Sequence, residues 1–435
     1  MARFTVPAPK RKRVKSVQNV LSIWWLAAVV IAVAALGCSD DSPDFIDVGV
    51  DVGDAASEQA SNHGGDSKGD HLDDVDVGDA EHSPDASLDA SSDAGSEAEA
   101  GFPFTLYCGE AVDGAVELEF EIESSTSAYT LVPLAYDEQS WIEPQNITTP
   151  GGEVIDFQGD NSFQIYGLHY PGFEWITAIT IPAAPNFVDQ LEHGLHSLHV
   201  HTGATDICYY LMEMQAVPVE IDLNIYLLGL DGIGLNAESA PTHPDFQSVL
   251  SSLEDIYDQV GLSLGEVRYP KVSDSLVDMY RVIHEESDIY ELLAHSEYPG
   301  HDIDSALSVN LFITEQFVYE AIGLAMGIPG IPGYHESLVS GVAMTGEYIG
   351  GDPNNNLFTA IAMAHEVGHF LGLFHTSETD GQGHDRLDDT PQCYDLTEIW
   401  DCPDAQNVMF PYIDYDTLEL TQDQGYVMRV NPLTK

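Results

Sequence analysis

Four residues near position 370 have the types and the spacing of a metal-dependent hydrolytic site. His365 and His369 are four residues apart, Glu366 follows the first of them directly, and His375 follows the second six residues later. On a helix, positions i and i+4 lie one turn apart on one face, so His365 and His369 could bind one zinc ion. Gly372 tolerates a positive φ, so we expect it to end the helix and let the chain bring His375 to the metal.

This ligand set indicates a catalytic rather than a structural zinc site. Three protein ligands leave the fourth tetrahedral position open for water. Zinc lowers the pKa of such a water towards about 7, and Glu366 is placed to accept its proton as a general base. The alternative is a chance HExxH string on an ordinary amphipathic helix. The five fixed residues of the longer string weigh against chance.

The residues around this motif alternate between strand and helix patterns, as in an α/β unit. Apolar residues alternate from 221 to 227, which predicts a strand, and Asp245 is expected to cap a helix that Gly261 terminates. We expect the active-site helix to be capped at Asn355 or Asn356. Further predicted elements are a strand near 265–269, a helix near 276–294, a strand over 307–313, a Gly- and Pro-rich break at 327–333 and a strand over 340–345. Residues 218–435 are therefore predicted to form an α/β (α+β) domain with a mixed twisted sheet.

Residues 102–217 have a different pattern, with short runs of aromatic and β-branched residues between turn-forming residues. Ala115–Ile122 alternates apolar and acidic positions, and Trp175–Ile181 is similar. We expect an all-β sandwich.

Four histidines cluster near the end of this β-rich region, at positions 193, 196, 199 and 201. His199 and His201 would share one face of a strand, which makes them a conceivable metal pair. A metal site usually needs third and fourth ligands at a defined spacing, and the sequence shows none. A structural role is therefore the favoured interpretation.

The chain has five cysteines. In an exported protein, cysteines that carry no other modification usually form disulfides. Without Cys38, which is assigned below, the other four permit three connectivities. Pairing within each domain is the economical choice, which gives Cys108–Cys208 and Cys393–Cys402. A thiolate of Cys108 acting as a plug on the zinc is the alternative.

The N-terminus combines a basic stretch with an apolar run, as export signals do. Six of the 13 Lys and Arg residues precede the apolar run Val20–Gly37. The sequence Ala35-Leu-Gly-Cys38 resembles a bacterial lipobox, which implies cleavage before Cys38 and lipidation of its sulfur. Residues 1–37 are therefore predicted to be a signal peptide. A transmembrane anchor is the alternative, because the run is just long enough to span.

Residues 38–101 are predicted to be the lipidated cysteine and an acidic disordered linker. Positions 39–100 hold nineteen acidic residues, one basic residue and one aromatic residue. Such a composition cannot bury a core, and repulsion between like charges favours an extended chain. We expect a tether that holds folded domains away from a membrane.

The formal net charge of −60 excludes several partners. A strongly acidic protein repels phosphate backbones, and no basic patch occurs after the N-terminus, so we expect no binding to nucleic acid. Attachment to a membrane would have to depend on the N-terminal lipid rather than on charge.

The extended string HExxHxxGxxH, read from His365 to His375, resembles the signature of metzincin zinc metalloproteases. The methionine turn of that clan is similar to the string Asn407-Val-Met409-Phe410. Its methionine, Met409, lies 34 residues after His375. The strings Gly383–Cys393 and Leu420–Gly425 look most like the pappalysin family. The resemblance implies a metzincin-like fold and a zinc-dependent endopeptidase acting on proteins or peptides.

The same resemblance implies two further features. Some metzincins have a tyrosine two residues after the methionine that contacts zinc or the transition state. Here Pro411 occupies that position, and Tyr412 follows it as the candidate. Pappalysin-like enzymes bind calcium near the Asp-Thr-Pro string, and an exposed acidic loop is the alternative. The calcium ligands implied here are Asp385, Asp388, Asp389 and Thr390.

The function predicted from the sequence is a zinc endopeptidase, exported and held by lipid in the envelope or on the surface of a bacterium. In this interpretation His365, His369 and His375 bind zinc, Glu366 is the general base, and residues 319–333 contain an edge strand that pairs with extended substrates. One alternative is an inactive adhesion or binding lipoprotein in which the sandwich is the functional part. The other is a zinc hydrolase acting on a non-peptide substrate.

Overall fold

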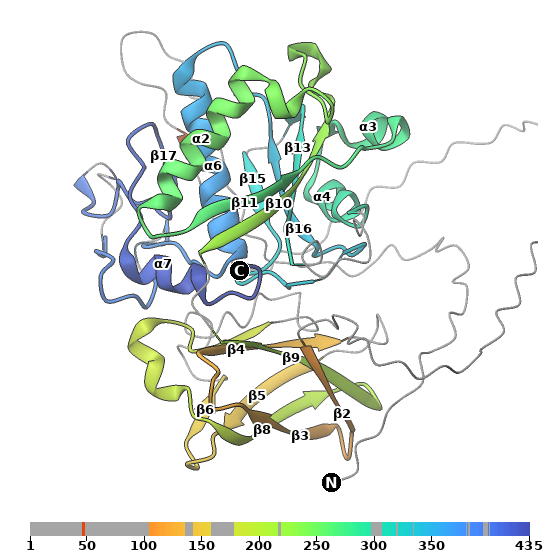
Figure 1. The fold of residues 1–435 in the computed structure, drawn as a ribbon, viewed down its shortest axis with the longest axis vertical. Coiled ribbons are helices and arrows are strands. Elements are labelled where there is room, and N and C mark those ends of the chain that lie inside the picture. The colour runs from red at the N-terminus through yellow and green to blue at the C-terminus, as the bar shows by residue number, and fades with distance from the viewer. Residues whose placement is uncertain are drawn as a thin grey trace, which may run out of the picture.

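The structure is a computed structural model, and Figure 1 shows its ribbon. It describes residues 46–47, 104–134, 142–157, 178–215, 219–296, 307–318, 321–333, 335–379, 381, 383–394, 399 and 401–435. The predicted signal peptide, Cys38 and all of the predicted linker except residues 46–47 lie outside these ranges. None of the helices in the described ranges combines the length and the apolar character needed to cross a membrane.

The first described domain is a sandwich of two antiparallel four-stranded sheets. One sheet has the order β2-β9-β4-β7 and the other has the order β3-β8-β5-β6. The strands are β2 (Phe104–Glu110), β3 (Ala115–Ile122), β4 (Ala128–Leu134), β5 (Ile142–Thr148), β6 (Val154–Asp156), β7 (Ile179–Ile181), β8 (Gly194–Thr202) and β9 (Asp206–Met214). Before β8 the chain forms the 3-10 helix η1 (Pro185–Gln190).

The alternation seen in the sequence explains how these strands pack. Along β3 the apolar residues from Val116 to Ile122 are buried, and the glutamates between them are exposed. Cys108 on β2 lies directly opposite Cys208 on β9, and the two form a disulfide. Cys108 is therefore not a thiolate plug.

The second domain contains a mixed five-stranded sheet of order β11-β10-β13-β16-β15. The strands β10 (Glu220–Leu228), β11 (Ser263–Arg268), β13 (Val309–Thr314) and β16 (Gly341–Thr345) are parallel, and the edge strand β15 (Gly323–Ala325) is antiparallel. Short pairs join β12 (Val282–Ile283) to β14 (Gln316–Phe317), and β1 (Ile46–Asp47) to β17 (Tyr412–Ile413). The fold class predicted from the sequence, an α/β (α+β) domain preceded by a β-sandwich, is confirmed.

Helices cover this sheet. α2 (Pro244–Asp258) and α6 (Pro353–Phe370) pack side by side against it, while α3 (Asp274–Tyr280) and α4 (Glu286–Leu293) lie on its other side (Figure 1). α7 (Gln422–Arg429) lies near the C-terminus, and the 3-10 helices η2 (Leu230–Ile233) and η3 (Ala240–Thr242) lead from β10 to α2.

Three details of the helices differ from the expectations. The N-cap of α2 is His243 rather than Asp245, because Pro244 occupies the first turn and the His243 side chain accepts the amide of Phe246. The helix expected near 276–294 is divided into α3 and α4, because the residues between them pair with β14 as strand β12.

The third difference concerns the N-terminus of α6, which lies earlier than expected. The N-cap is Asp352, whose carboxylate accepts the amide of Asn354 at 2.8 Å. Asn356 is not a cap. Its side-chain oxygen accepts the amide of Gly350, and its amide group donates to Asp245 of α2.

The sandwich has its own hydrophobic core, and a few of its residues also pack into the core of the α/β domain. Val132, Ala178 and Met212 of the sandwich belong to the same cluster of buried residues as the strands and helices of the α/β domain. Asn186 of η1 also donates to the carbonyl of Arg386 at 3.1 Å. The sheet that contains β4 and β9 is the one that faces the α/β domain (Figure 1).

Candidate metal centre

The structure brings the three predicted zinc ligands together. Nε2 of His365 lies 3.0 Å from Nε2 of His369 and 3.3 Å from Nε2 of His375. In a tetrahedral zinc site each nitrogen is about 2.0–2.1 Å from the metal, which places the nitrogens about 3.3 Å apart. These two distances match the spacing of ligands to one tetrahedral ion, and ligand atoms of all three histidines lie within 4.8 Å of one another.

The other ring nitrogen of each histidine already has an acceptor. Nδ1 of His365 lies 2.6 Å from the carbonyl of Val408, and Nδ1 of His369 lies 2.7 Å from the carbonyl of Leu373. Nδ1 of His375 lies 3.1 Å from the carboxylate of Glu378. These partners place the proton on Nδ1 and direct the lone pair of Nε2 towards the metal position.

Burial keeps the imidazoles of His365 and His369 neutral. The side chains of His365 and His369 are fully buried, and His375 is 2% exposed. Burial, reinforced by the neighbouring His375, lowers the pKa of His365 to about 3. Burial also lowers the pKa of His369 well below its ordinary value. Neutral imidazole is the form that binds a metal ion.

Local sequence explains how α6 and the next loop position the ligands. His365 and His369 lie on one face of α6, which ends at Phe370. Gly372 then adopts a φ of +111°, so the chain turns and delivers His375, as predicted.

Glu366 lies beneath the edge strand β15. Its side chain is fully buried, and neither carboxylate oxygen has a hydrogen-bond partner. A Cβ atom at Gly323 would lie 2.6 Å from the Glu366 side chain, so glycine at this position allows β15 to pass close to Glu366. Burial raises the pKa of Glu366 well above its ordinary value. A carboxylate with a raised pKa is a stronger proton acceptor.

The methionine turn holds the ligand segments together. The carbonyl of Val408 accepts from His365, and the carbonyl of Met409 accepts from the amide of Thr376 at 3.0 Å. Met409 is fully buried under α6, where a Cβ at Gly368 would lie 2.8 Å from its Sδ atom. Tyr412 follows on β17, with its ring 5.9 Å from that of Phe410 between centroids.

A buried pair of amides supports this turn, and the sequence did not reveal it. Asn407 donates to Oε1 of Gln424, and Gln424 donates to Oδ1 of Asn407, both at 2.9 Å. The same Oδ1 atom accepts the amide of Met409 at 2.8 Å. A polar residue fifteen positions after a methionine gives no signal of such pairing in a single sequence.

The predicted calcium residues differ in burial. Asp385 and Thr390 are buried and hydrogen-bonded to each other, whereas Asp388 and Asp389 are exposed. Asp389 instead accepts the amide of Asp423 at 3.0 Å.

Asp404, which the sequence analysis missed, lies near Asp385. It is 2% exposed, and its charge contributes to raising the pKa of Asp385 to about 7, although burial is the main cause. Ser377 donates to Oδ2 of Asp404 at 2.6 Å, while Oδ1 of Asp404 and Oδ2 of Asp385 are buried without a partner. Such orphaned carboxylate oxygens are the donors that a hard cation such as Ca²⁺ prefers.

The second expected disulfide, Cys393–Cys402, is present and lies next to this region. Phe410 of the methionine turn packs against both cysteines. The amide of Cys393 donates to the hydroxyl of Ser377 at 2.9 Å.

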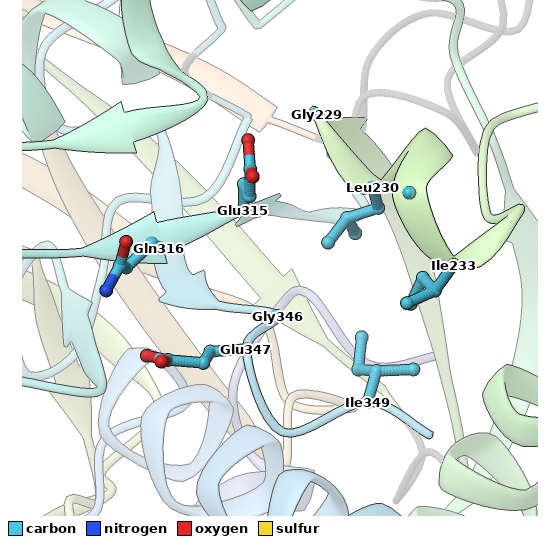
Figure 2. Close-up of a pocket in the computed structure, with 9 residues that line it drawn as sticks. Gly229, Leu230, Ile233, Glu315, Gln316, Gly346, Glu347 and Ile349 are labelled. Atoms are coloured by element: carbon cyan, nitrogen blue, oxygen red, sulfur yellow. The ribbon is translucent and has the colours of Figure 1, made fainter. Parts of the chain in front are cut away.

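A separate pocket of about 260 Å³ opens at the carboxyl ends of β10, β13 and β16. Figure 2 shows Glu315 and Glu347 on one side of it and Leu230, Ile233 and Ile349 on the other. Glu315 is paired with Arg281 at 2.7 Å. No residue of the histidine centre lines this pocket.

Comparisons with known proteins agree with this geometry for part of the chain. No curated protein matches. Among solved structures, archaemetzincin from Methanopyrus kandleri is 14% identical, covers 49% of this chain and 88% of its own, and has a TM-score of 0.26. A β-(1,4)-mannanase, GH26-CBM35, from Podospora anserina is 13% identical, covers 50% of this chain and 46% of its own, and has a TM-score of 0.16. Likenesses at these TM-scores carry no weight for fold or function.

The family comparison is more informative. The family model described as pregnancy-associated plasma protein-A, a peptidase family, matches residues 297–433. That range holds α6, the three histidines, the methionine turn and α7. Over these residues the chain is similar to that peptidase family, which agrees with the metzincin-type resemblance that the sequence indicated and supports a zinc metallopeptidase.

Proposed function

We propose that the protein is a zinc-dependent endopeptidase that hydrolyses peptide bonds in proteins. The observation that carries this proposal is the convergence of three buried Nε2 atoms, each on a ring whose Nδ1 has its own acceptor. The unpartnered carboxylate of Glu366 follows the first of these ligands on α6. This arrangement suits zinc with an open fourth position.

When bound, zinc would supply a water of lowered pKa and polarise the scissile carbonyl. Glu366 takes the proton of the attacking water on one of its free carboxylate oxygens and then donates it to the leaving amine. Burial under β15 excludes bulk water from this carboxylate and strengthens its interactions.

The position of β15 supports an extended peptide as the substrate. β15 is the last strand in the order of the sheet and lies within residues 319–333, where the sequence predicted a substrate-binding edge. An extended peptide that pairs with an edge strand gains main-chain hydrogen bonds. Because Gly323 lies directly over Glu366, such a peptide would pass beside the general base.

A substitution at Glu366 tests this mechanism. Glu366→Gln keeps the size of the side chain but cannot accept the proton, so we expect zinc content to stay at wild-type level and peptide cleavage to fall by at least about 100-fold. Glu347→Gln, an exposed glutamate at the separate pocket, is the matched control and should cleave normally. Cleavage by Glu366→Gln near the wild-type rate would refute the mechanism.

The same assay separates the alternatives. An inactive binding lipoprotein would retain zinc yet cleave no member of a peptide library, with or without chelator. A hydrolase of another substrate class would also spare peptides but would turn over non-peptide esters or amides in a zinc-dependent way. The intact set of ligands and Glu366 favours the peptidase.

We further propose calcium as a structural ion at Asp385 and Asp404, supported by their orphaned oxygens. This differs from the set implied by resemblance, because Asp388 and Asp389 are exposed.

Lipid attachment at Cys38 to a bacterial envelope, after removal of residues 1–37, also remains our proposal, and it rests on the sequence alone. Metabolic lipid labelling of wild type and Cys38→Ser tests it. An unlabelled wild-type protein that stays with the membrane would favour a spanning segment instead.

A further inference from the structure

The outer face of the β3-β8-β5-β6 sheet carries the histidine pair for which the sequence offered no further ligands. His199 and His201 lie two residues apart on β8, and both are half-buried. Side chains alternate along a strand, so both point away from the core in which Leu198 and Val200 are buried. The ring centroids of the two histidines are 5.2 Å apart.

Strand register places a glutamate beside each histidine. Glu117 of β3 lies directly opposite His199, and Glu143 of β5 lies directly opposite His201. Opposite residues have Cβ atoms about 4.5–5.5 Å apart, and diagonal neighbours about 7–8 Å apart, which imidazole and glutamate side chains can bridge. Both glutamates are exposed, and Ser197 donates to one carboxylate oxygen of Glu117 at 2.8 Å.

The charge of this domain also favours a bound cation. The sequence has no Lys or Arg between Lys68 and Arg268, so the sandwich contains no permanently cationic side chain. Glu119 and Glu121 are exposed on the same face of β3 as Glu117. Repulsion among these carboxylates is relieved by a positive ion, and the sandwich itself supplies none.

We propose that His199, His201, Glu117 and Glu143 form a binding site for a borderline divalent transition metal such as Zn²⁺. Imidazole nitrogen and carboxylate oxygen are zinc ligands, whereas Ca²⁺ takes oxygen ligands only. The four side chains extend from three neighbouring strands of one sheet, but no three of their ligand atoms lie within 4.8 Å of one another, so binding requires these side chains to rotate towards a common point. This site is separate from the proposed peptidase centre.

The other two histidines of the cluster have different environments. His196 is 1% exposed inside the sandwich, where its ring stacks on that of Phe120. Nε2 of His193 lies 3.0 Å from the carbonyl of Thr126. His193 and His196 therefore serve as internal controls, because they are histidines of the same domain that the metal should not bind.

Equilibrium dialysis of the full chain against Zn²⁺, with zinc counted per chain, tests the proposal. Wild type should bind one equivalent more than His199→Ala/His201→Ala, because the centre at His365 is intact in both. The excess should also be lost or weakened in Glu117→Gln. Glu121→Gln is the matched control, since it removes the same charge on the same strand but lies opposite Leu195.

Three results would overturn the proposal. They are equal zinc content in wild type and the double variant, equal weakening by Glu117→Gln and Glu121→Gln, or displacement of the extra zinc by excess Ca²⁺.

Carbethoxylation of wild type followed by peptide mapping gives a test that needs no variant. Zinc should protect His199 and His201 but leave His193 reactive, and the absence of such protection would refute the site. None of these readouts depends on peptidase activity, so either proposal can fail alone.

Discussion

The amide pair of Asn407 and Gln424 should control zinc affinity through the methionine turn. Gln424 is fully buried on α7 and Asn407 is 4% exposed. Asn407 fixes the amide of Met409, and the carbonyl of the intervening Val408 orients His365. A change at Gln424 therefore reaches a zinc ligand through two hydrogen-bonded steps without touching it.

The expected size of the effect follows from the bonds that are lost. In Gln424→Ala, the side-chain amide of Asn407 loses its acceptor, and so does the backbone amide of Thr421, which Gln424 accepts at 2.9 Å. Each donor left without a partner costs about 1–3 kcal/mol, so the loss of both acceptors should lower the unfolding free energy by about 2–6 kcal/mol. Loss of an outer hydrogen-bond partner of a metal ligand commonly lowers metal affinity about 10- to 100-fold, and we expect zinc affinity to fall within that range.

The assay is competition for zinc against a chromophoric chelator, combined with urea unfolding. Gln424→Met keeps the volume of the side chain but removes the amide, so it separates hydrogen bonding from packing. Gln422→Ala, an exposed glutamine on the same helix, should change neither quantity. Leu292→Ala on α4 removes a fully buried side chain that lies outside the turn, so it should lower stability but leave zinc affinity intact.

Two outcomes would refute this reasoning. If Gln424→Met lost stability but bound zinc as wild type does, the amide pair would support the fold and not the metal centre. If Leu292→Ala weakened zinc binding as much as Gln424→Met does, the effect would be one of general stability.

Three further predictions concern other parts of the chain. Gly368→Ala should lower both melting temperature and zinc retention, because its Cβ would lie 2.8 Å from Sδ of Met409; unchanged values of both would contradict this. Calcium should raise the melting temperature of wild type by binding linkage, and Asp385→Asn should reduce that shift; equal shifts would remove Asp385 from the site. Burial lowers the pKa of His196 from 6.5, so the unfolded chain binds more protons below that pH and the stability of the sandwich should fall on acidification. Urea unfolding at several pH values should show this loss, and His196→Phe should diminish it.

The zinc ligands could be predicted because their geometry is local. Helical spacing places His365 and His369 on one face, and Gly372 reaches a φ of +111° that most residues avoid. Their outer partners were not predictable to the same degree. Glu378 lies three residues after His375, so its contact with that histidine could be predicted from the local sequence. The carbonyl of Val408, in contrast, meets His365 only after the chain has folded.

Local signals also misplaced helix ends where tertiary contacts decided them. Asn354, Asn355 and Asn356 are all good N-caps in isolation, but Asp352 is equally good, and Pro353 at the first helical position was the signal that favoured it. In the fold, Asn356 is used to tie α6 to Asp245 of α2. Between α3 and α4, pairing with β14 prevails over a continuous helical pattern.

The metal site proposed on the sandwich depends on the register between strands, which the sequence of a single strand does not encode. Alternation shows that Glu117 and His199 face outward, but it does not show that β3 and β8 are neighbours or which residues meet. The observed register puts Glu117 opposite His199 and Ala115 opposite His201. A slip of two residues would keep every side chain on its face yet place Ala115 or Glu119 opposite His199. Register therefore determines which residue adjoins each histidine, and this is why the sequence indicated only a histidine pair, whereas the metal site is proposed from the structure.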